Sequence, residues 1–166
     1  MKDIEQLLRE MTLEEKAIIV SGTNFMYTNK IERLGIPEVC TSDGPHGLRK
    51  QAADAKDNGV STSEPATSFP TAVTTSSGWN KENLYKMGEA IGQECSSYNV
   101  DVLLGPGVNI KRNPLCGRNF EYFSEDPYLV GVMGSAHVKG VMSQHVDVSL
   151  KHFALNNSEN YRFMGN

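Results

Sequence analysis

The sequence predicts an α/β protein in which a parallel sheet is connected by helical crossovers. Apolar runs of strand length alternate with segments of helical period, in the order strand, strand, helix, strand, helix, strand. Polar residues gather directly after the predicted strands, at the edge where α/β barrels and open α/β sheets bind their ligands. The pattern therefore predicts a fold class and the position of a site, but it does not name a substrate.

The composition is that of an ordinary globular protein and fits one domain by length. The chain has 166 residues, of which 39% are hydrophobic and 22% charged, and its net charge is −4. It carries no basic footprint for nucleic acid, and no apolar run approaches the roughly 18 residues of a membrane helix. Acidic residues are scattered through the first helix, which is unlike a signal peptide. We therefore expect a cytoplasmic protein with no nucleic-acid or membrane partner.

The three cysteines argue against a disulfide scaffold and against a structural zinc site. Cys40, Cys95 and Cys116 are odd in number, widely spaced and not arranged as a C-x-x-C pair. We expect reduced thiols that serve as small buried hydrophobic side chains. No metal site is predicted.

Two short helices are predicted at the amino terminus, within residues 1–22. Residues 3–11 have apolar side chains at helical spacing. Thr12 followed by Glu15 is a capping-box pattern for a second helix, which Gly22 can close. We expect both helices to cover a surface of the domain that follows. The apolar face of the first helix consists of Ile4, Leu7, Leu8 and Met11.

Four short segments read as strands because they are apolar or β-branched and end at turn residues. The third, residues 100–104, is almost continuously apolar, as expected of a buried parallel strand. Residues 50–68 are polar and without period, which predicts a long loop. The four predicted strands are residues 36–41, 69–75, 100–104 and 146–150.

Two longer helices are predicted between these strands. Asn80 can cap the first of them, and Asp126 followed by Pro127 is a typical start for the second. His137 and His145 are expected on the surface or at the end of the second helix. The expected buried faces are Leu84, Met87, Ile91 and Cys95 in the first helix, and Leu129, Met133, Ala136 and Gly140 in the second.

Four short segments, in a fixed order along the chain, carry a family resemblance. They are Asp43-Gly44-Pro45-His46-Gly47-Leu48-Arg49, Gly105-Pro106-Gly107-Val108-Asn109-Ile110 with Arg112-Asn113-Pro114, Gly117-Arg118-Asn119-Phe120-Glu121 with Phe123-Ser124-Glu125-Asp126-Pro127, and Lys151-His152-Phe153 with Asn156, Asn157 and Glu159. Each segment alone is a weak signal. Together they resemble the motif set of glycoside hydrolase family 3, of the β-glucosidase type, and the resemblance covers nearly the whole chain.

The resemblance implies a (β/α)₈ TIM-barrel-like fold with the sugar site at the carboxyl ends of the strands. Family members usually add a second α/β domain. Residues 1–166 would then be the N-terminal portion of the barrel domain, about half of it, with residues 1–22 as lead-in helices. Its partners would be the remainder of the barrel, the C-terminal domain and a small β-glucoside or oligosaccharide substrate. The resemblance implies no cofactor.

The resemblance also implies which residues line the subsite for the terminal sugar. A carboxylate accepts hydrogen bonds from two neighbouring hydroxyls, and cations donate charge-assisted bonds that are roughly twice as strong as neutral ones. A histidine can donate or accept, according to its tautomer. His46 and Asn157 are further candidates for positions near the site. The implied subsite residues are Asp43, Arg49, Arg118, Lys151 and His152.

Each of these residues also has a structural reading. Asp43 could fix the turn before Gly44 and Pro45, and Arg49 could be a solvated loop charge. Arg118 could pair with Glu121 or Glu125, and Lys151 with His152 could form a structural pair at a strand end. Glu121 is expected mainly to orient Arg118, and Asp126 to cap a helix.

A retaining glycosidase needs two carboxyl groups, one as nucleophile and one as acid/base. In the family the nucleophile is an aspartate, often followed by tryptophan, and no Asp-Trp pair occurs in this sequence. We therefore expect both catalytic carboxyl groups beyond Asn166 and an isolated chain that does not turn over substrate. Two alternatives remain: a non-catalytic sugar-binding or assembly piece, and an unrelated α/β binding protein.

Overall fold

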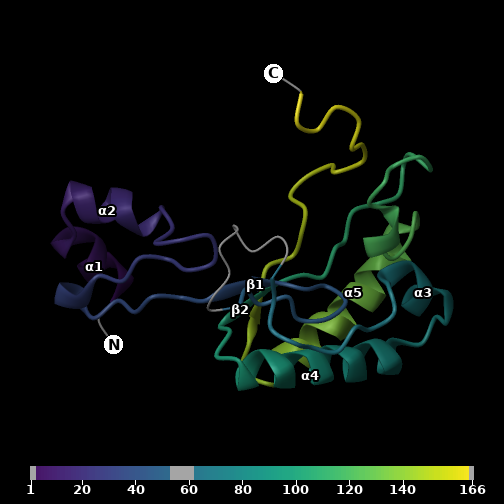
Figure 1. Cartoon of the computed structure of the whole chain (residues 1–166), viewed down its shortest axis with the longest axis horizontal. Coiled ribbons are helices and arrows are strands. Elements are labelled where there is room, and N and C mark those ends of the chain that lie inside the picture. Colours follow the sequence, from purple (N-terminus) through teal and green to yellow (C-terminus); the bar gives the residue numbers. More distant parts are fainter. Residues whose placement is uncertain (1–2, 53–61, 165–166) are drawn as a thin grey trace.

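Three short parallel strands form the sheet at the centre of the molecule (Figure 1). The computed structural model describes residues 3–52 and 62–164. The strands lie in chain order, β1-β2-β3, and each pairs in parallel with the next. Parallel neighbours require crossover connections, and helices supply both of them. The elements are α1 Ile4–Glu10, α2 Leu13–Ile19, η1 Glu32–Leu34, β1 Thr41–Asp43, α3 Ala72–Ser77, α4 Lys81–Ser97, β2 Val102–Leu104, η2 Asn119–Glu121, α5 Pro127–Met142 and β3 Asp147–Val148.

The register of the strands brings their carboxyl ends to one edge. Asp43 at the end of β1 pairs with Leu104 at the end of β2. Beyond β2, Gly107 forms parallel bridges to both Tyr122 and Lys151. The loops that follow β2, η2 and β3 therefore run side by side above this edge, as expected for the ligand edge of a parallel α/β sheet.

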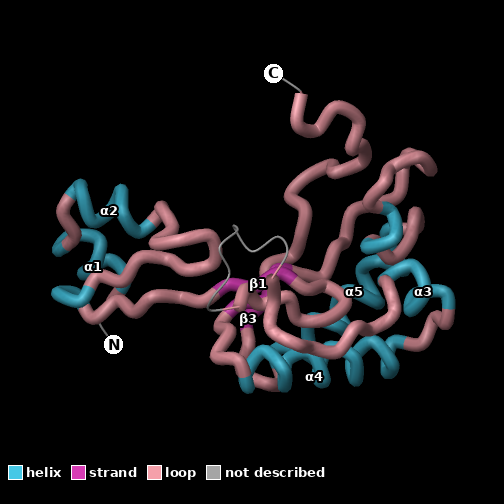
Figure 2. The backbone as a smooth tube through the Cα atoms, in the orientation of Figure 1, coloured by secondary structure: helices cyan, strands magenta, loops and turns pink. Residues whose placement is uncertain are grey.

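Helices α4 and α5 pack along each other on one side of the sheet (Figure 2). Both begin where the sequence predicts. The Asn80 side chain accepts hydrogen bonds from the backbone N–H groups of Glu82 and Asn83, and Asp126 caps α5 by accepting from the N–H of Tyr128. The main core lies between these helices and the strands, and its buried members are Cys40, Leu48, Met87, Ile91, Cys95, Val100, Leu103, Val141 and Val146.

The two amino-terminal helices are also present and have a small core of their own. Thr12 and Glu15 form the predicted capping box, with both reciprocal hydrogen bonds. Helix α2 ends at Ile19, ahead of the predicted stop at Gly22. Met11, Ile31 and Leu34 are buried together. This unit lies beside the sheet, away from α4 and α5 (Figure 1).

The predicted strand at residues 69–75 is wrong, because helix α3 begins at Ala72. The β-branched residues in this stretch suggested a strand. The helix instead buries Ala72 and Ser76, one turn apart, and the Ser76 hydroxyl donates to the carbonyl of Phe123 at 2.6 Å. Three strands are therefore found in the described residues, where the sequence suggested four.

The first strand lies further along the chain than predicted. Residues 36–41 were expected to form it, but β1 comprises Thr41–Asp43. Ile36 forms an isolated antiparallel bridge with Ile31 and packs on the amino-terminal core. The fourth predicted strand, residues 146–150, is confirmed as the shorter β3.

His137 is buried, which contradicts its expected place on a helix surface. Its side chain is 1% exposed on the inner face of α5. Burial lowers the pKa of His137 to about 4, so the ring is neutral near pH 7. His145 lies at the end of α5 and is exposed, as predicted. The three cysteines are free and buried, as predicted.

The predicted loop at residues 50–68 lies partly outside the described residues. Its described flanks, residues 50–52 and 62–68, contain no helix or strand. Within the described ranges, no helix has the length and apolar character needed to span a bilayer. The same ranges contain no group of three or more His, Cys, Asp or Glu side chains arranged to hold a metal.

Glycines set how closely α4 and α5 approach, and one of them provides a test of this packing. A Cβ at Gly140 would lie 2.1 Å from the carbonyl oxygen of Tyr85, whereas one at Gly131, on the same helix, would meet nothing within 4 Å. We expect Gly140→Ala to lower the free energy of unfolding by about 1–3 kcal/mol through overpacking. Gly131→Ala should raise it by up to about 1 kcal/mol through helix propensity. Denaturant unfolding of both variants measures this, and equal effects would contradict the packing.

Candidate functional site

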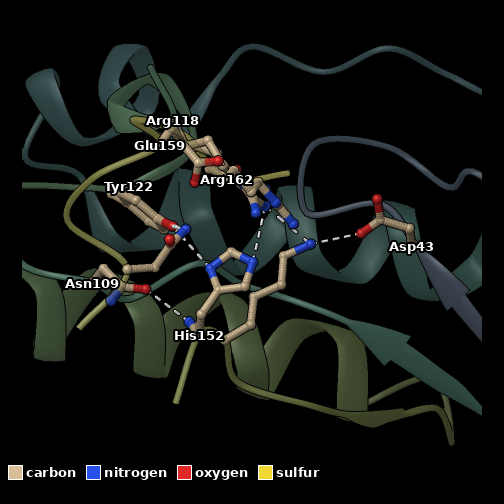
Figure 3. A network of polar contacts seen from close by, with 10 residues as sticks. Asp43, Asn109, Arg118, Tyr122, His152, Glu159 and Arg162 are labelled. Atoms are coloured by element: carbon tan, nitrogen blue, oxygen red, sulfur yellow. Dashed lines mark hydrogen bonds and ion pairs between the residues drawn. The ribbon is translucent and has the colours of Figure 1, made fainter. Parts of the chain in front are cut away.

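The charged residues singled out in the sequence converge at the carboxyl edge of the sheet (Figure 3). Asp43 is the last residue of β1, and Lys151 follows β3 at the bridge to Gly107. Arg118 and Glu121 come from η2 and the residue before it. Three segments that are far apart in the sequence thus contribute side chains to one cluster.

Lys151 connects the two carboxylates of the cluster. Its ammonium nitrogen Nζ lies 2.6 Å from Oδ1 of Asp43 and 3.9 Å from Oε2 of Glu121. Glu121 is 4% exposed, so its charge is compensated by protein groups and not by bulk water. The lysine therefore holds a half-exposed carboxylate beside a buried one.

Arg118 occupies the other side of Glu121. Its Nε donates to Oε1 of Glu121. Of the two predicted carboxylate partners, Glu121 and Glu125, the structure therefore pairs Arg118 with Glu121. Its Nη2 lies 2.8 Å from Nε2 of His152. The guanidinium is thus fixed at two points before any ligand arrives.

His152 is held through its ring and its backbone. The ring nitrogen Nδ1 lies 2.8 Å from the hydroxyl of Tyr122, and the backbone N–H donates to Oδ1 of Asn109 at 2.8 Å. Asn156 donates to the same Tyr122 hydroxyl at 2.7 Å. Both ring nitrogens already have protein partners, so a direct bond from His152 to a sugar would require one of them to be exchanged.

A hollow of about 350 Å³ lies beside this cluster. Its volume is at the small end of the range of roughly 300–1,000 Å³ for small-molecule sites. A larger groove of about 760 Å³ runs along α4 and α5, but its lining lacks the convergent charge pairs of the smaller hollow. We therefore place the candidate site in the smaller hollow, which is lined by Asp43, Gly44, Pro45, His46, Gly47, Arg49, Arg118, Phe120 and Glu121.

The local charges keep Asp43 ionised. Burial alone would raise the pKa of this carboxyl, but it is outweighed by the hydrogen bond and charge of Lys151, the backbone N–H of Gly44 and the charge of Arg49 together. The pKa of Asp43 therefore lies below its ordinary value. A carboxylate that stays charged in a partly closed hollow is suited to accept hydrogen bonds from hydroxyl groups.

The structure places each predicted site residue at or beside the hollow. Asp43, Arg49 and Arg118 line it, and Lys151 bonds to Asp43 from behind. His152 lies one contact further away, against Arg118. The backbone N–H of Arg49 donates to the carbonyl of Asp43 at 2.8 Å, so the main chain folds back between these two residues.

Sequence reasoning missed three polar residues of this network. They belong to, or adjoin, the quoted motifs, yet nothing local distinguishes them from surface residues. Their partners lie 30 or more positions away in the chain. Only the parallel arrangement of the loops brings them together. These residues are Asn109, Tyr122 and Asn156.

The profile of the Glycosyl hydrolase family 3 N terminal domain matches residues 9–160. The chain belongs to glycosyl hydrolase family 3. It is 54% identical, over 160 residues, to a thermostable beta-glucosidase B of Acetivibrio thermocellus, covering 96% of this chain. It is 52% identical, over 156 residues, to an exo-alpha-(1->6)-L-arabinopyranosidase of Bifidobacterium longum, covering 93% of this chain.

Solved structures of family members have the same fold. Beta-glucosidase 3B of Thermotoga neapolitana, in complex with alpha-D-glucose, matches 95% of this chain with a TM-score of 0.84 and 42% identity. The beta-glucosidase of Kluyveromyces marxianus matches 99% with a TM-score of 0.87 and 41% identity. The three parallel strands and their helices are thus the first part of a TIM-barrel-like domain.

The chain spans only about a fifth of the length of these relatives. It covers 21% of each of the two relatives named from sequence. It covers 24% and 19% of the two solved chains. This family membership confirms the predicted family and excludes the alternative of an unrelated α/β binding protein.

The charge pair of Asp43 and Lys151 can be tested by titration. In Lys151→Met the hydrogen bond and the positive charge are lost, so burial dominates and the pKa of Asp43 should rise. The same change at Lys139, an exposed residue of α5, should leave it unmoved. Carbon-13 NMR of the Asp43 carboxyl against pH measures both.

The sign of the accompanying stability change is also fixed. In the unmodified protein the pKa of Asp43 is lower in the folded state than in the unfolded state. Asp43 therefore stabilises the fold at pH values above its unfolded-state pKa, and this stabilisation is lost as the pH falls through its folded-state pKa. In Lys151→Met the folded state disfavours the charged form of Asp43, so Asp43 should destabilise the fold at neutral pH, and this destabilisation should disappear as the pH falls. An Asp43 titration that is identical in the two proteins would refute the pairing.

Proposed function

We propose that this chain supplies much of the sugar subsite of a family 3 glycoside hydrolase that releases terminal, non-reducing β-D-glucose. The observation that carries the proposal is the ionised Asp43 in the hollow, flanked by Lys151, Arg49 and Arg118. A carboxylate and several cations on one wall can engage neighbouring hydroxyls of one pyranose. Membership of the family makes a sugar the appropriate ligand.

Each residue would have a defined part in binding. Asp43 would accept from two adjacent hydroxyls, while Lys151 keeps it charged. Arg118, fixed by Glu121, would donate its remaining N–H groups to a hydroxyl oxygen, and Arg49, which also lines the hollow, would donate to another. Hydrogen bonds that strengthen as the ring flattens toward an oxocarbenium ion lower the barrier by several kcal/mol in such enzymes.

The chemistry of bond cleavage requires two further carboxyl groups. In a retaining mechanism, one attacks the anomeric carbon and forms a glycosyl–enzyme intermediate, while the other protonates the leaving oxygen and then activates water. Both carboxyl groups of the cluster are committed to cations in the structure, which suits binding more than attack. We therefore assign nucleophile and acid/base to the part of the larger protein that this chain does not include.

A chimera tests the function directly. The segment of the thermostable beta-glucosidase B that aligns with this chain is replaced by it, so that the relative supplies the remaining four fifths of the protein. We expect the chimera to hydrolyse p-nitrophenyl β-D-glucoside, and this chain alone to give no turnover. Turnover by the isolated chain, at its expected mass, would overturn the assignment of the catalytic groups.

In the chimera, Asp43→Asn should lower kcat/KM for this substrate roughly 100-fold, because two charge-assisted hydrogen bonds of about 1.5 kcal/mol each are weakened. The matched control is Asp147→Asn, an exposed aspartate at the opposite end of the sheet. It should change kcat/KM less than twofold. Comparable losses in both variants would argue for a general effect on folding.

The sugar itself needs a separate comparison, because relatives of nearly equal identity carry different names. One is a beta-glucosidase and another an exo-alpha-(1->6)-L-arabinopyranosidase. The chimera should therefore be assayed in parallel with p-nitrophenyl α-L-arabinopyranoside. A higher kcat/KM for this second substrate would replace glucose by arabinopyranose and keep the subsite assignment.

An uncovered apolar surface supports the view that this chain works with further parts of the domain. Among the residues that the structure describes, strand β3 pairs only with β2. An apolar hollow of about 360 Å³ lies next to this strand along α5. Leu150 lines this hollow and is 54% exposed. A helix that is apolar on most sides, as α5 is, normally lies inside a larger core. The remainder of the barrel is the expected cover.

The effect of one substitution should depend on whether that cover is present. Leu150→Asp in the isolated chain should change the free energy of unfolding by no more than about 0.5 kcal/mol, as an exposed substitution does. In the chimera it should cost about 2–5 kcal/mol, because the side chain is then buried. Thermal unfolding of both proteins gives the comparison. An equal effect in both would favour the alternative of a free-standing, non-catalytic piece.

A further inference from the structure

The phenol of Tyr122 is buried, and its hydroxyl contacts the charged cluster through the ring of His152. Its side chain is 1% exposed. Its hydroxyl lies 2.8 Å from Nδ1 of His152 and accepts a hydrogen bond from Asn156 at 2.7 Å (Figure 3). Tyr122 does not line the hollow itself. Its contact with the histidine links its hydroxyl to Arg118, which does line the hollow.

The contact with Arg118 determines which atom donates and which accepts in the hydrogen bonds of the His152 ring. A guanidinium only donates, so Nε2 of His152, which lies 2.8 Å from Nη2 of Arg118, must accept with its lone pair. A neutral imidazole then carries its proton on Nδ1. This proton can only be donated to the oxygen of Tyr122, which therefore acts as an acceptor.

We propose that Tyr122 is a positioning residue, which accepts the Nδ1–H proton of His152 and thereby holds the ring where its Nε2 lone pair meets Arg118. The inference rests on the proposed function in one respect, that the ligand oriented by Arg118 is a sugar. Arg118 is then held from two sides, by Glu121 at Nε and by His152 at Nη2. Its remaining N–H groups are left for hydroxyls in the hollow.

The surroundings of His152 agree with a neutral ring. Burial lowers its pKa, and the charge of Arg118 lowers it further. The main chain of the histidine is held as well, because its backbone N–H donates to Oδ1 of Asn109 on the loop after β2. Burial also raises the pKa of Tyr122, so its phenol stays protonated near pH 7.

Nitrogen-15 NMR of the histidine side chains reads the tautomer without any need for catalytic activity. In the unmodified chain at pH 7, we expect Nδ1 of His152 in the protonated range of chemical shift and Nε2 in the unprotonated range. In Tyr122→Phe the acceptor is gone while the shape of the aromatic ring is kept, so the His152 ring is no longer held on Arg118. Nε2, released from the guanidinium, should then shift toward the protonated range. Tyr128→Phe is the matched control, since Tyr128 is 79% exposed, and should leave both signals unmoved.

The binding consequence is measured in the chimera by glucose titration and by kinetics. Tyr122→Phe should weaken glucose binding roughly 5- to 10-fold, the worth of about one hydrogen bond, and should raise KM more than it lowers kcat. Thermal unfolding within a few degrees of the unmodified chimera would exclude a general loss of structure.

Two results would overturn the proposal. The first is a His152 ring protonated at Nε2 in the unmodified chain, which needs no folded variant to observe. The second is a Tyr122→Phe protein whose tautomer and glucose affinity are both unchanged. If the tautomer responds as expected and the unmodified chimera binds no sugar, the positioning of Arg118 stands and the sugar as its ligand fails.

Discussion

The buried carboxylate of Glu121 is the group on which the arrangement of the site depends. A charge with only 4% of its residue surface exposed requires compensation from the protein, and it obtains this from Arg118 and Lys151 on either side. The two cations are thereby brought to the edge of one hollow. Lys151 in turn keeps Asp43 ionised. Removal of Glu121 would leave two cations close together without a common counter-ion.

This charge arrangement is possible only because the backbone delivers its members to one place. Asp43 and Lys151 are 108 positions apart, yet both follow strands of the same parallel sheet. Gly107 allows the loops after β2, η2 and β3 to approach, since a Cβ there would lie 2.8 Å from the carbonyl oxygen of Glu121. Fold and site are thus linked through close contacts of main chain. The side chains add specificity to an edge that the strands create.

The sequence predicted the helices that have strong local signals and the charged residues that belong to ordered motifs. The caps at Asn80 and Asp126 are local, and the structure confirms both. The segment at 69–75 was misread because the contact of Ser76 with Phe123 spans 47 positions and has no local signature. Tyr122 was missed for the same reason, since its role depends on His152. Local patterns therefore identify elements and charges, whereas the contacts that orient them arise from the tertiary fold.

The ion pairs and the neutral hydrogen bonds of the site differ in what they contribute to stability and to geometry. The ion pairs around Glu121 contribute little net stability, because desolvation offsets most of their attraction. The neutral network of Tyr122, Asn156 and Asn109 costs less to bury and fixes geometry. A site that must distinguish hydroxyl positions on a ring benefits from this division, since the charges supply binding strength and the neutral groups hold them still. The apolar face along α5 supplies neither binding strength nor fixed geometry. Its burial against the rest of the barrel would add hydrophobic stabilisation, which would offset the cost of burying the polar groups at the site.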